Sequence, residues 1–182
     1  MPQLRESPKY ENVGAMKILE TERLILREID AAGDAELMLQ ILNEPAFIEH
    51  VADRSVRTVE EASEFIRQRI LPSYAEHGFG FYVVESKESG APVGISGLVK
   101  RETMEDVDIG YSTLREYWGR GYAFEAASAL MEHGRTVHRL PRIVGVAGVN
   151  NHASAKLLEK LGLRYTRMVQ LPGYSDEGRL FA

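Results

Sequence analysis

The chain of 182 residues contains no cysteine, and this absence removes several classes of chemistry. It excludes a disulfide framework, a thiolate nucleophile and zinc bound through cysteine. The five histidines show no HExxH or comparable spacing, so we expect no metal site. No apolar run approaches the length of a membrane span, and we find no signal peptide. These absences favour a cytoplasmic protein but name no function.

Positive charge is also in short supply. The chain has 22 Lys and Arg against 27 Asp and Glu, a net charge of −5. This balance argues against a nucleic-acid partner bound by bulk charge, and an anionic cofactor would need a local site. The composition is close to globular averages, and the length suits a single domain with a real core. We expect a flexible N-terminal extension over residues 1–16 and one domain over 17–182.

The most informative stretch runs from Asp108 to Glu125. A predicted strand leads into a turn containing Gly119 and Gly121, and this turn opens a predicted helix. The first N–H groups of a helix lack intrahelical partners and carry partial positive charge, so the turn suits a phosphate or pyrophosphate. A GxGxxG motif does not fit because Phe124 occupies the third glycine position, and no P-loop is present. The alternative is a tight strand–helix turn with a packed Trp118.

Periodicity and turn residues predict the remaining elements. Three strands before the glycine turn favour an antiparallel meander and distinguish the chain from a Rossmann domain. Gly94 and Gly97 indicate a bulge or a close backbone approach. The predicted strands are 21–28, 79–85, 92–99, 106–114, 142–149, 163–170 and 178–181. The predicted helices are one capped by Asp30 and ended by Pro45, one opened by a Thr58–Glu61 capping box and interrupted by Pro72, one over 122–133 stopped by Gly134, and one over 153–161.

Two blocks in register resemble the GNAT acetyltransferase superfamily. Gly121-Tyr122-Ala123 fills the second half of its acetyl-CoA loop, Arg/Gln-x-x-Gly-x-Gly/Ala, and Trp118 stands where Arg or Gln often stands. The variant Trp-Gly-x-Gly-Tyr-Ala resembles the RimJ/RimL-type branch, as does the opening Thr-Glu-Arg-Leu-x-Leu-Arg. Residues 149–154 and 157–163 resemble the family's Asn-x-x-Ser/Ala and Glu-Lys-Leu-Gly-Phe block. The resemblance spans roughly residues 20 to 181.

The resemblance implies a fold and an activity. The fold is a three-layer α+β arrangement with a mixed, mostly antiparallel sheet of about six to seven strands and helices on both faces. A splayed parallel strand pair, ending near Thr113 and starting near Ile143, would hold the arm of coenzyme A. The activity is transfer of acetyl from acetyl-CoA to a primary amine, either a protein N-terminus or a small molecule, through a tetrahedral intermediate. A non-catalytic acyl-CoA sensor on the same fold is the alternative, and a homodimer is compatible with either.

The resemblance also assigns the cofactor contacts. The N–H groups of five consecutive residues would hold the pyrophosphate: Gly119, Arg120, Gly121, Tyr122 and Ala123. The Arg120 side chain either adds charge or is simply solvated. A main-chain N–H among Ser112, Thr113 and Leu114 would polarise the thioester carbonyl. Asn150 or Asn151 would contact the pantetheine amides, with helix capping as the alternative role.

For catalysis, Asp108 is the leading base. It precedes Ile109-Gly110 where many relatives carry Glu, and its shorter side chain would need a bridging water. Asp106, on the same strand face, and a chain of waters are the alternatives. Ser154 is the candidate that orients or protonates the sulfur, because Leu158 occupies the family's usual Tyr position. Glu125 is expected to support its own helical turn.

Residues of the acceptor site cannot be read from a motif. In the family, the two helices after the first strand flank this site. Phe47, His50 and Tyr74 are therefore candidates to line it, with ordinary packing as the alternative.

Overall fold

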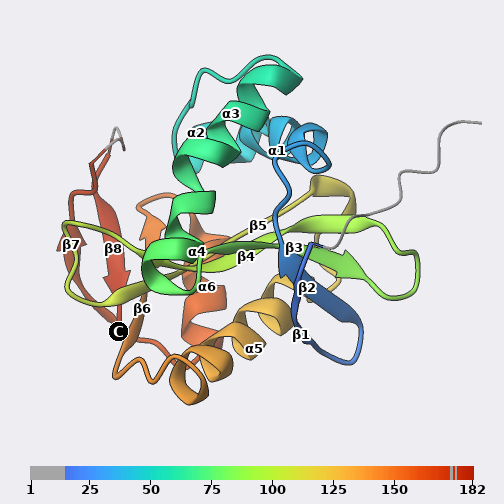
Figure 1. Cartoon of the computed structure of the whole chain (residues 1–182). Coiled ribbons are helices and arrows are strands. Elements are labelled where there is room, and N and C mark those ends of the chain that lie inside the picture. The colour runs from blue at the N-terminus through green and yellow to red at the C-terminus, as the bar shows by residue number, and fades with distance from the viewer. Residues whose placement is uncertain (1–14, 173, 175) are drawn as a thin grey trace, which may run out of the picture.

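The computed structural model describes residues 15–172, 174 and 176–182, which form one eight-stranded sheet in the order β1-β2-β3-β4-β5-β6-β8-β7 (Figure 1). This is more than the six to seven strands expected, because the short segment 17–20 also forms a strand, which pairs with the strand that follows it. The expected extension lies largely outside the described residues, which begin at residue 15. The strands are β1 Lys17–Glu20, β2 Leu24–Glu28, β3 Phe81–Ser86, β4 Pro92–Lys100, β5 Val107–Thr113, β6 Ile143–Gly148, β7 Tyr165–Val169 and β8 Gly178–Phe181.

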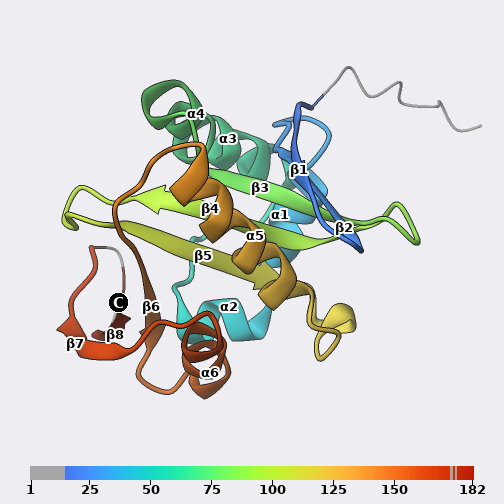
Figure 2. The same cartoon turned by 90° about the horizontal axis from the view of Figure 1, so that it is seen from below.

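Helices cover both faces of this sheet. Helices α1, α2 and α3 lie on one face and α5 and α6 on the other, while α4 packs against α3 (Figures 1 and 2). The helices are α1 Ala35–Leu42, α2 Pro45–His50, α3 Val59–Arg69, α4 Leu71–His77, a 3₁₀ turn η1 Arg115–Tyr117, α5 Tyr122–Thr136 and α6 His152–Lys160. The expected three-layer α+β arrangement is confirmed.

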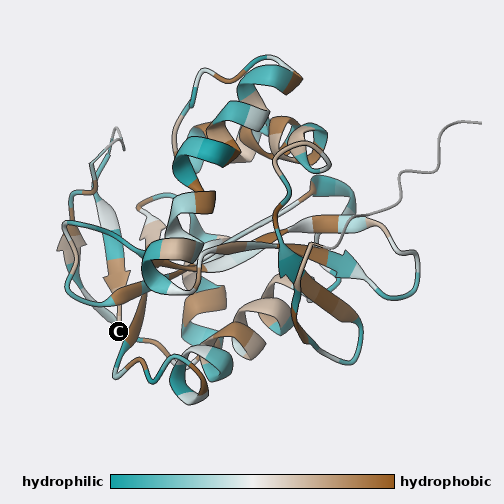
Figure 3. Cartoon of the chain, viewed as in Figure 1, coloured by the Kyte–Doolittle hydropathy of each residue, from teal (hydrophilic) through white to brown (hydrophobic). Residues whose placement is uncertain are grey.

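Strand alternation divides the core between the two faces. Val83 and Ile95 pack toward α1 and α3, whereas Tyr82 and Val84 pack toward α5. Hydrophobic residues follow the central strands, and hydrophilic residues colour much of α3 (Figure 3). Burial of both sheet faces fixes the register, because a slip of one residue would exchange the two sets of side chains.

Three predicted helix boundaries are wrong, each for a local reason. Asp30 does not cap α1; its carboxylate accepts the N–H groups of the following turn, and Asp34 holds the cap position instead. Pro45 opens α2 rather than ending α1, because proline suits the first helical position. Helix α5 continues through Gly134, where an added Cβ would lie 2.9 Å from Ile143 Cδ1. The capping box of Thr58 and Glu61 is confirmed.

The predicted close approach at Gly94 and Gly97 is also confirmed. A Cβ on Gly94 would collide with the Ser112 carbonyl, and one on Gly97 with the Gly80 carbonyl. These glycines let β4 lie tightly between β3 and β5.

The sheet is antiparallel except at β5 and β6. These two strands run parallel and pair only at Val107 with Ile143 and at Asp108 with Val144. Beyond Asp108, β5 continues to Thr113 while β6 pairs with β8 instead, so the two strands diverge (Figure 2). The predicted splay is therefore present, and it opens toward the start of α5.

Candidate functional site

The start of α5 is exposed and built for close approach. Gly121, its N-cap residue, has φ of 79°, and Gly119 has φ of 75°, both in the left-handed region that favours glycine. The first hydrogen bond of α5 runs from the Glu125 N–H to the Gly121 carbonyl at 3.1 Å. No side chain of the described residues caps this end. The preceding amides of the turn can therefore serve an external acceptor.

The splay supplies a second set of main-chain groups beside this turn. From Ile109 to Thr113, β5 has no paired partner on its β6 side within the described chain. From Gly145 to Gly148, β6 pairs with β8 on its other edge, and its edge facing β5 has no paired strand within the described chain. An extended ligand that carries amides can bond to such edges as an added strand does.

The three candidates at the end of β5 are not equivalent. Leu114 is buried, and its N–H already donates to the Val93 carbonyl at 2.9 Å. It is therefore not available to polarise a carbonyl. Because hydrogen-bonded pairs alternate along an antiparallel ladder, the Ser112 N–H also points to β4, and Thr113 remains. The Trp118 indole N–H donates to the Thr113 carbonyl at 2.7 Å, which ties the turn to the end of the strand.

Arg120 is exposed and folds back over the 3₁₀ turn. Its guanidinium lies 5.3 Å from the Tyr117 ring centroid, and Nη2 donates to the Glu116 carbonyl at 3.3 Å. This contact leaves open both roles weighed from the sequence, namely added charge at the turn or solvation.

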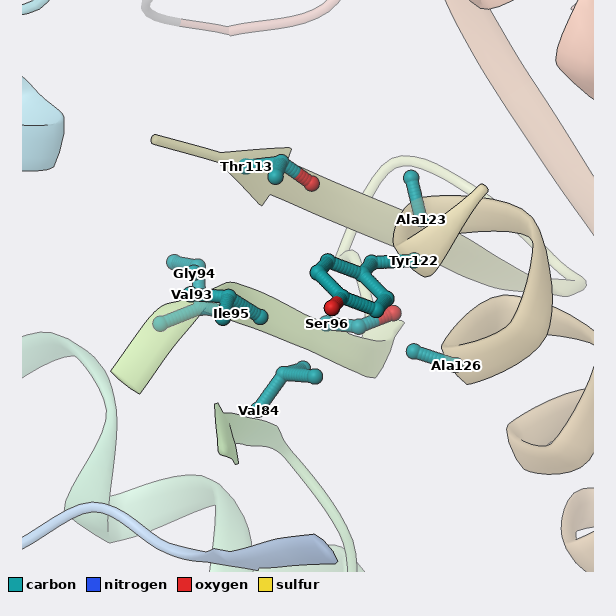
Figure 4. A pocket seen from close by; sticks show the side chains of 9 residues that line it. All are labelled: Val84, Val93, Gly94, Ile95, Ser96, Thr113, Tyr122, Ala123 and Ala126. Carbon is teal, nitrogen blue, oxygen red and sulfur yellow. The ribbon is translucent and has the colours of Figure 1, made fainter. Parts of the chain in front are cut away.

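A narrow recess lies on the opposite, β4 side of β5 (Figure 4). Gly94 and Thr113 line it from the strands, and Tyr122, Ala123 and Ala126 line it from α5. It has no room for a water molecule. The side chains of Tyr122 and Ala123 therefore pack the start of α5 onto the sheet.

Asp108 stands where the splay begins. Its side chain is 2% exposed, and its Oδ2 accepts Arg101 Nε at 2.8 Å and Nη2 at 2.7 Å. The other oxygen, Oδ1, is buried without a hydrogen-bond partner in the described chain. Burial raises the pKa of Asp108, and the Arg101 guanidinium and the main-chain N–H of Val146 on β6 oppose that rise. The geometry leaves one oxygen free to accept a proton.

The rival Asp106 lies in a different environment. It is half-buried before β5 begins, and its nearest cation is Arg142, at 3.6 Å. Asp108 is therefore the carboxylate that combines burial with a free oxygen beside the splay.

Ser154 is joined to a residue that sequence reasoning missed. The Tyr111 hydroxyl lies 2.9 Å from Ser154 Oγ and 3.2 Å from the Ser154 carbonyl. Burial raises the pKa of Tyr111 to about 12, so the phenol stays protonated at neutral pH. Leu158 instead lies in the core, where its side chain occupies the space that a Cβ on Gly145 would need. Tyr111 stands between Gly110 and Ser112 on β5, and nothing in the sequence pattern marked it.

Asn151 has the capping role that was the alternative. Its Oδ1 accepts the Ser154 N–H at 3.0 Å and opens α6. Asn150 is exposed in the same turn. Arg179, also missed from the sequence, donates through Nη2 to the carbonyls of Gly148 and Asn151 at 3.2 and 3.3 Å. Asn151 and Arg179 thus fix the turn between β6 and α6.

The three residues predicted to line the acceptor site lie in different environments. Tyr74 is engaged in packing: its hydroxyl bonds to the Ile29 N–H and the Phe81 carbonyl, and its ring stacks on Tyr82. Phe47 packs against the core below α1. The His50 carbonyl lies 3.1 Å from the position of a Cβ on Gly148, which places the end of α2 beside the end of β6.

Comparison with known proteins decides the family. Residues 23–164 match the acetyltransferase (GNAT) domain. The chain belongs to the GNAT acetyltransferase family. It is 30% identical over 151 residues to the uncharacterised N-acetyltransferase p20 of Bacillus licheniformis, covering 82% of this chain and 83% of that protein. We therefore describe it as an N-acetyltransferase.

Solved GNAT structures share the fold. An acetyltransferase from Agrobacterium tumefaciens aligns with a TM-score of 0.75 and 23% identity, over 100% of this chain and 97% of its own. RimL, an L7/L12 α-N-protein acetyltransferase solved with coenzyme A, aligns with a TM-score of 0.77 and 18% identity, over 91% and 96%. At these identities the likeness shows the GNAT fold alone.

The described part of the chain has neither a membrane-spanning helix nor a cluster of metal ligands. No helix among its residues is long and apolar enough to cross a membrane. No cluster of three or more His, Asp or Glu there could hold a metal ion.

Proposed function

We propose that this GNAT enzyme uses acetyl-CoA and transfers the acetyl group to a primary amine. The α-amine of a protein N-terminus, as in the RimJ/RimL-type branch, is the acceptor we favour over a small-molecule amine. The observation that carries the proposal is the position of the α5 turn. Its free amides lie directly beyond the diverging edges of β5 and β6, so one elongated ligand can engage both.

The residues present suit such a ligand. The amides from Gly119 to Ala123 would take the pyrophosphate, since they combine positive φ glycines with a helix N-terminus. The unpaired edges of β5 and β6 would take the amides of the pantetheine arm. The N–H of Thr113 would donate to the thioester oxygen, where negative charge develops. Bound acetyl-CoA would supply the acyl carbon that the amine attacks.

Asp108 would act as the general base. An amine must lose a proton to attack, and Oδ1 of Asp108 is a buried acceptor with no other partner in the described chain. A bridging water would connect the two. An α-amine has a pKa of about 7.7–8.0, so a moderately basic carboxylate suffices, whereas a lysine near 10.4 would need a stronger base. This difference is the reason for preferring an N-terminal acceptor.

Ser154 and Tyr111 would serve the leaving group. A departing thiolate is stabilised by a hydrogen-bond donor or a proton. The two hydroxyls share a hydrogen bond of 2.9 Å, so one can donate to the sulfur while the other holds its orientation. Tyr111 thus provides a phenol near the site although Leu158 provides none.

The absence of cysteine gives a direct assay. Release of free coenzyme A can be followed with a thiol reagent, because the enzyme contributes no thiol of its own. We expect release that depends on peptides with free N-termini and is abolished when the same peptides are N-formylated. Release with polyamines alone would redirect the acceptor assignment. Saturable acetyl-CoA binding without release for any amine would favour the non-catalytic sensor.

A further inference from the structure

Glu125 is held by residues from the far end of the chain. Its Oε1 accepts the Thr21 hydroxyl at 2.5 Å and the Arg23 main-chain N–H at 2.9 Å. Its Oε2 accepts Arg23 Nε at 2.6 Å, and Nη2 makes an ion-pair contact with the same oxygen at 2.6 Å. The carboxylate that was expected to support its own helix thus ties the first turn of α5 to the segment before β2.

Arg23 also contacts the turn itself. Its Nη1 donates to the Arg120 carbonyl at 3.0 Å. The guanidinium lies 4.9 Å from the Tyr122 ring centroid, and Nη2 lies 3.5 Å from the position that a Cβ on Gly121 would take. One planar group therefore contacts Glu125 and three consecutive residues of the turn, a geometry that the fork of arginine permits and the point charge of lysine does not.

This arrangement neutralises the charge of Glu125, which would otherwise oppose anion binding at the turn. A carboxylate in the first turn of α5 would repel an anion bound at the same helix end. A carboxylate has about four lone-pair sites, and three hydrogen bonds and one ion-pair contact surround those of Glu125. The charge is neutralised by Arg23, and the peptide units of the turn are fixed at the same time.

We propose that Arg23, held by Glu125, is a positioning residue for the turn that binds the pyrophosphate of acetyl-CoA. The inference rests on the proposed function and adds a residue from outside the cofactor motif. Preorganisation of a loop improves affinity by reducing the ordering cost of binding. Loss of the clamp formed by Thr21, Arg23 and Glu125 should therefore weaken acetyl-CoA binding and leave the transfer step largely intact.

Glu125→Gln is the sharpest test, because two explanations predict opposite signs. If only charge mattered, removing a negative group would tighten binding of an anion. If the clamp matters, the amide disrupts the contacts of Arg23 and raises Kd for acetyl-CoA about tenfold, equivalent to about 1.4 kcal/mol. Arg23→Ala should raise Kd at least as much, with kcat at saturating acetyl-CoA within about twofold of wild type. Arg23→Lys should recover only part of the loss.

Arg27 on β2 provides the matched control. It pairs with Asp34 at 2.8 Å and with Glu85 at 2.7 Å, away from the turn. Arg27→Ala should lower the unfolding temperature without changing Kd. Isothermal titration and thermal unfolding of all four variants separate the outcomes. No binding by wild type would overturn the proposed function itself. Normal wild-type binding with Kd unchanged or lower in Glu125→Gln would overturn the role of the clamp, even if Arg23→Ala fails to fold.

Discussion

Asp108 joins two properties that rarely coincide in a strand residue. It is almost fully buried, yet half of its carboxylate has no partner in the described chain. Arg101 compensates the charge through Oδ2, which makes the burial tolerable and leaves Oδ1 for chemistry. This carboxylate lies at the closed end of the splay, on the last residue of β5 that pairs with β6.

Replacing Asp108 with Asn should lower kcat/KM by about 100-fold or more, the usual contribution of a general base. The amide has nearly the same shape but cannot take up a proton. Asp106→Asn, two residues earlier and just before β5 begins, is the matched control and should stay within about twofold of wild type. Because Arg101 loses its partner, unfolding temperatures must be measured alongside the steady-state rates. A rate for Asp108→Asn within about twofold would remove the assigned role.

Tyr111 and Ser154 should behave as a unit. We expect Tyr111→Phe and Ser154→Ala each to lower kcat about tenfold, and the double variant to be little worse than the poorer single variant, since coupled groups are not additive. Steady-state kinetics of the four-member cycle measure this. Tyr165→Phe, an exposed tyrosine outside the site, is the control. Fully additive losses would show that the two hydroxyls act separately.

At the scale of elements, the turn before α5 is the central feature. Gly121→Ala should weaken acetyl-CoA binding about tenfold, because an L-residue at φ of 79° is strained by about 1–2 kcal/mol and would distort the turn. Gly162→Ala carries the same type of strain, at φ of 92°, beyond the end of α6. It should lose comparable stability and bind normally. Equal Kd values for the two variants in a calorimetric titration would disprove the assignment of the turn.

Local signals were sufficient for much of this architecture. The capping box of Thr58 and Glu61, the β3–β4 hairpin and the two strand–helix blocks could each be predicted, because neighbours in sequence decide them. The strand β1 could not, since its four residues are too few for a periodic pattern and gain their conformation from pairing with β2. Pro45 was placed at the wrong helix, because proline both ends one helix and opens another.

The side-chain contacts of the site were the least predictable part. Arg23 and Glu125 lie 102 positions apart, and Tyr111 and Ser154 lie 43 apart. The periodicity of one segment does not indicate which distant segment it will contact. Asp108 could be named as a base from its motif, but its pairing with Arg101 depends on the length of the β4–β5 turn. The prediction of Asn151 as a cofactor contact competed with capping, and the structure shows capping.

At the scale of the whole molecule, a pair of histidines gives stability a pH dependence. His138 packs edge-on against His133 and Phe79, and its Nε2 is buried without a hydrogen bond in the described chain. Burial lowers the pKa of both His133 and His138. The folded state then binds fewer protons, so the contribution is present above about pH 6.5 and is lost as pH falls below it.

The unfolding temperature of wild type should therefore fall between pH 7.5 and pH 5.5 by more than that of His138→Phe. A difference of about 2 °C is expected, on a scale where 1 kcal/mol shifts Tm by about 2–4 °C for chains of this size. Phenylalanine keeps the ring contact with Phe79 and removes the titrating group. Scanning calorimetry at the two pH values measures both chains. An equal fall in the two would assign the pH dependence to other groups.

The measurement that tests the account most directly is a calorimetric titration of the purified protein with acetyl-CoA, in parallel with desulfo-CoA and a longer acyl-CoA. The account predicts saturable binding at one molecule per chain, with acetyl-CoA preferred over the longer acyl-CoA. It also predicts that desulfo-CoA binds, because the turn before α5 and the diverging edges of β5 and β6 engage the pyrophosphate and pantetheine. Absence of binding for all three ligands would contradict the cofactor assignment, and with it the roles given to Asp108, Ser154 and Arg23.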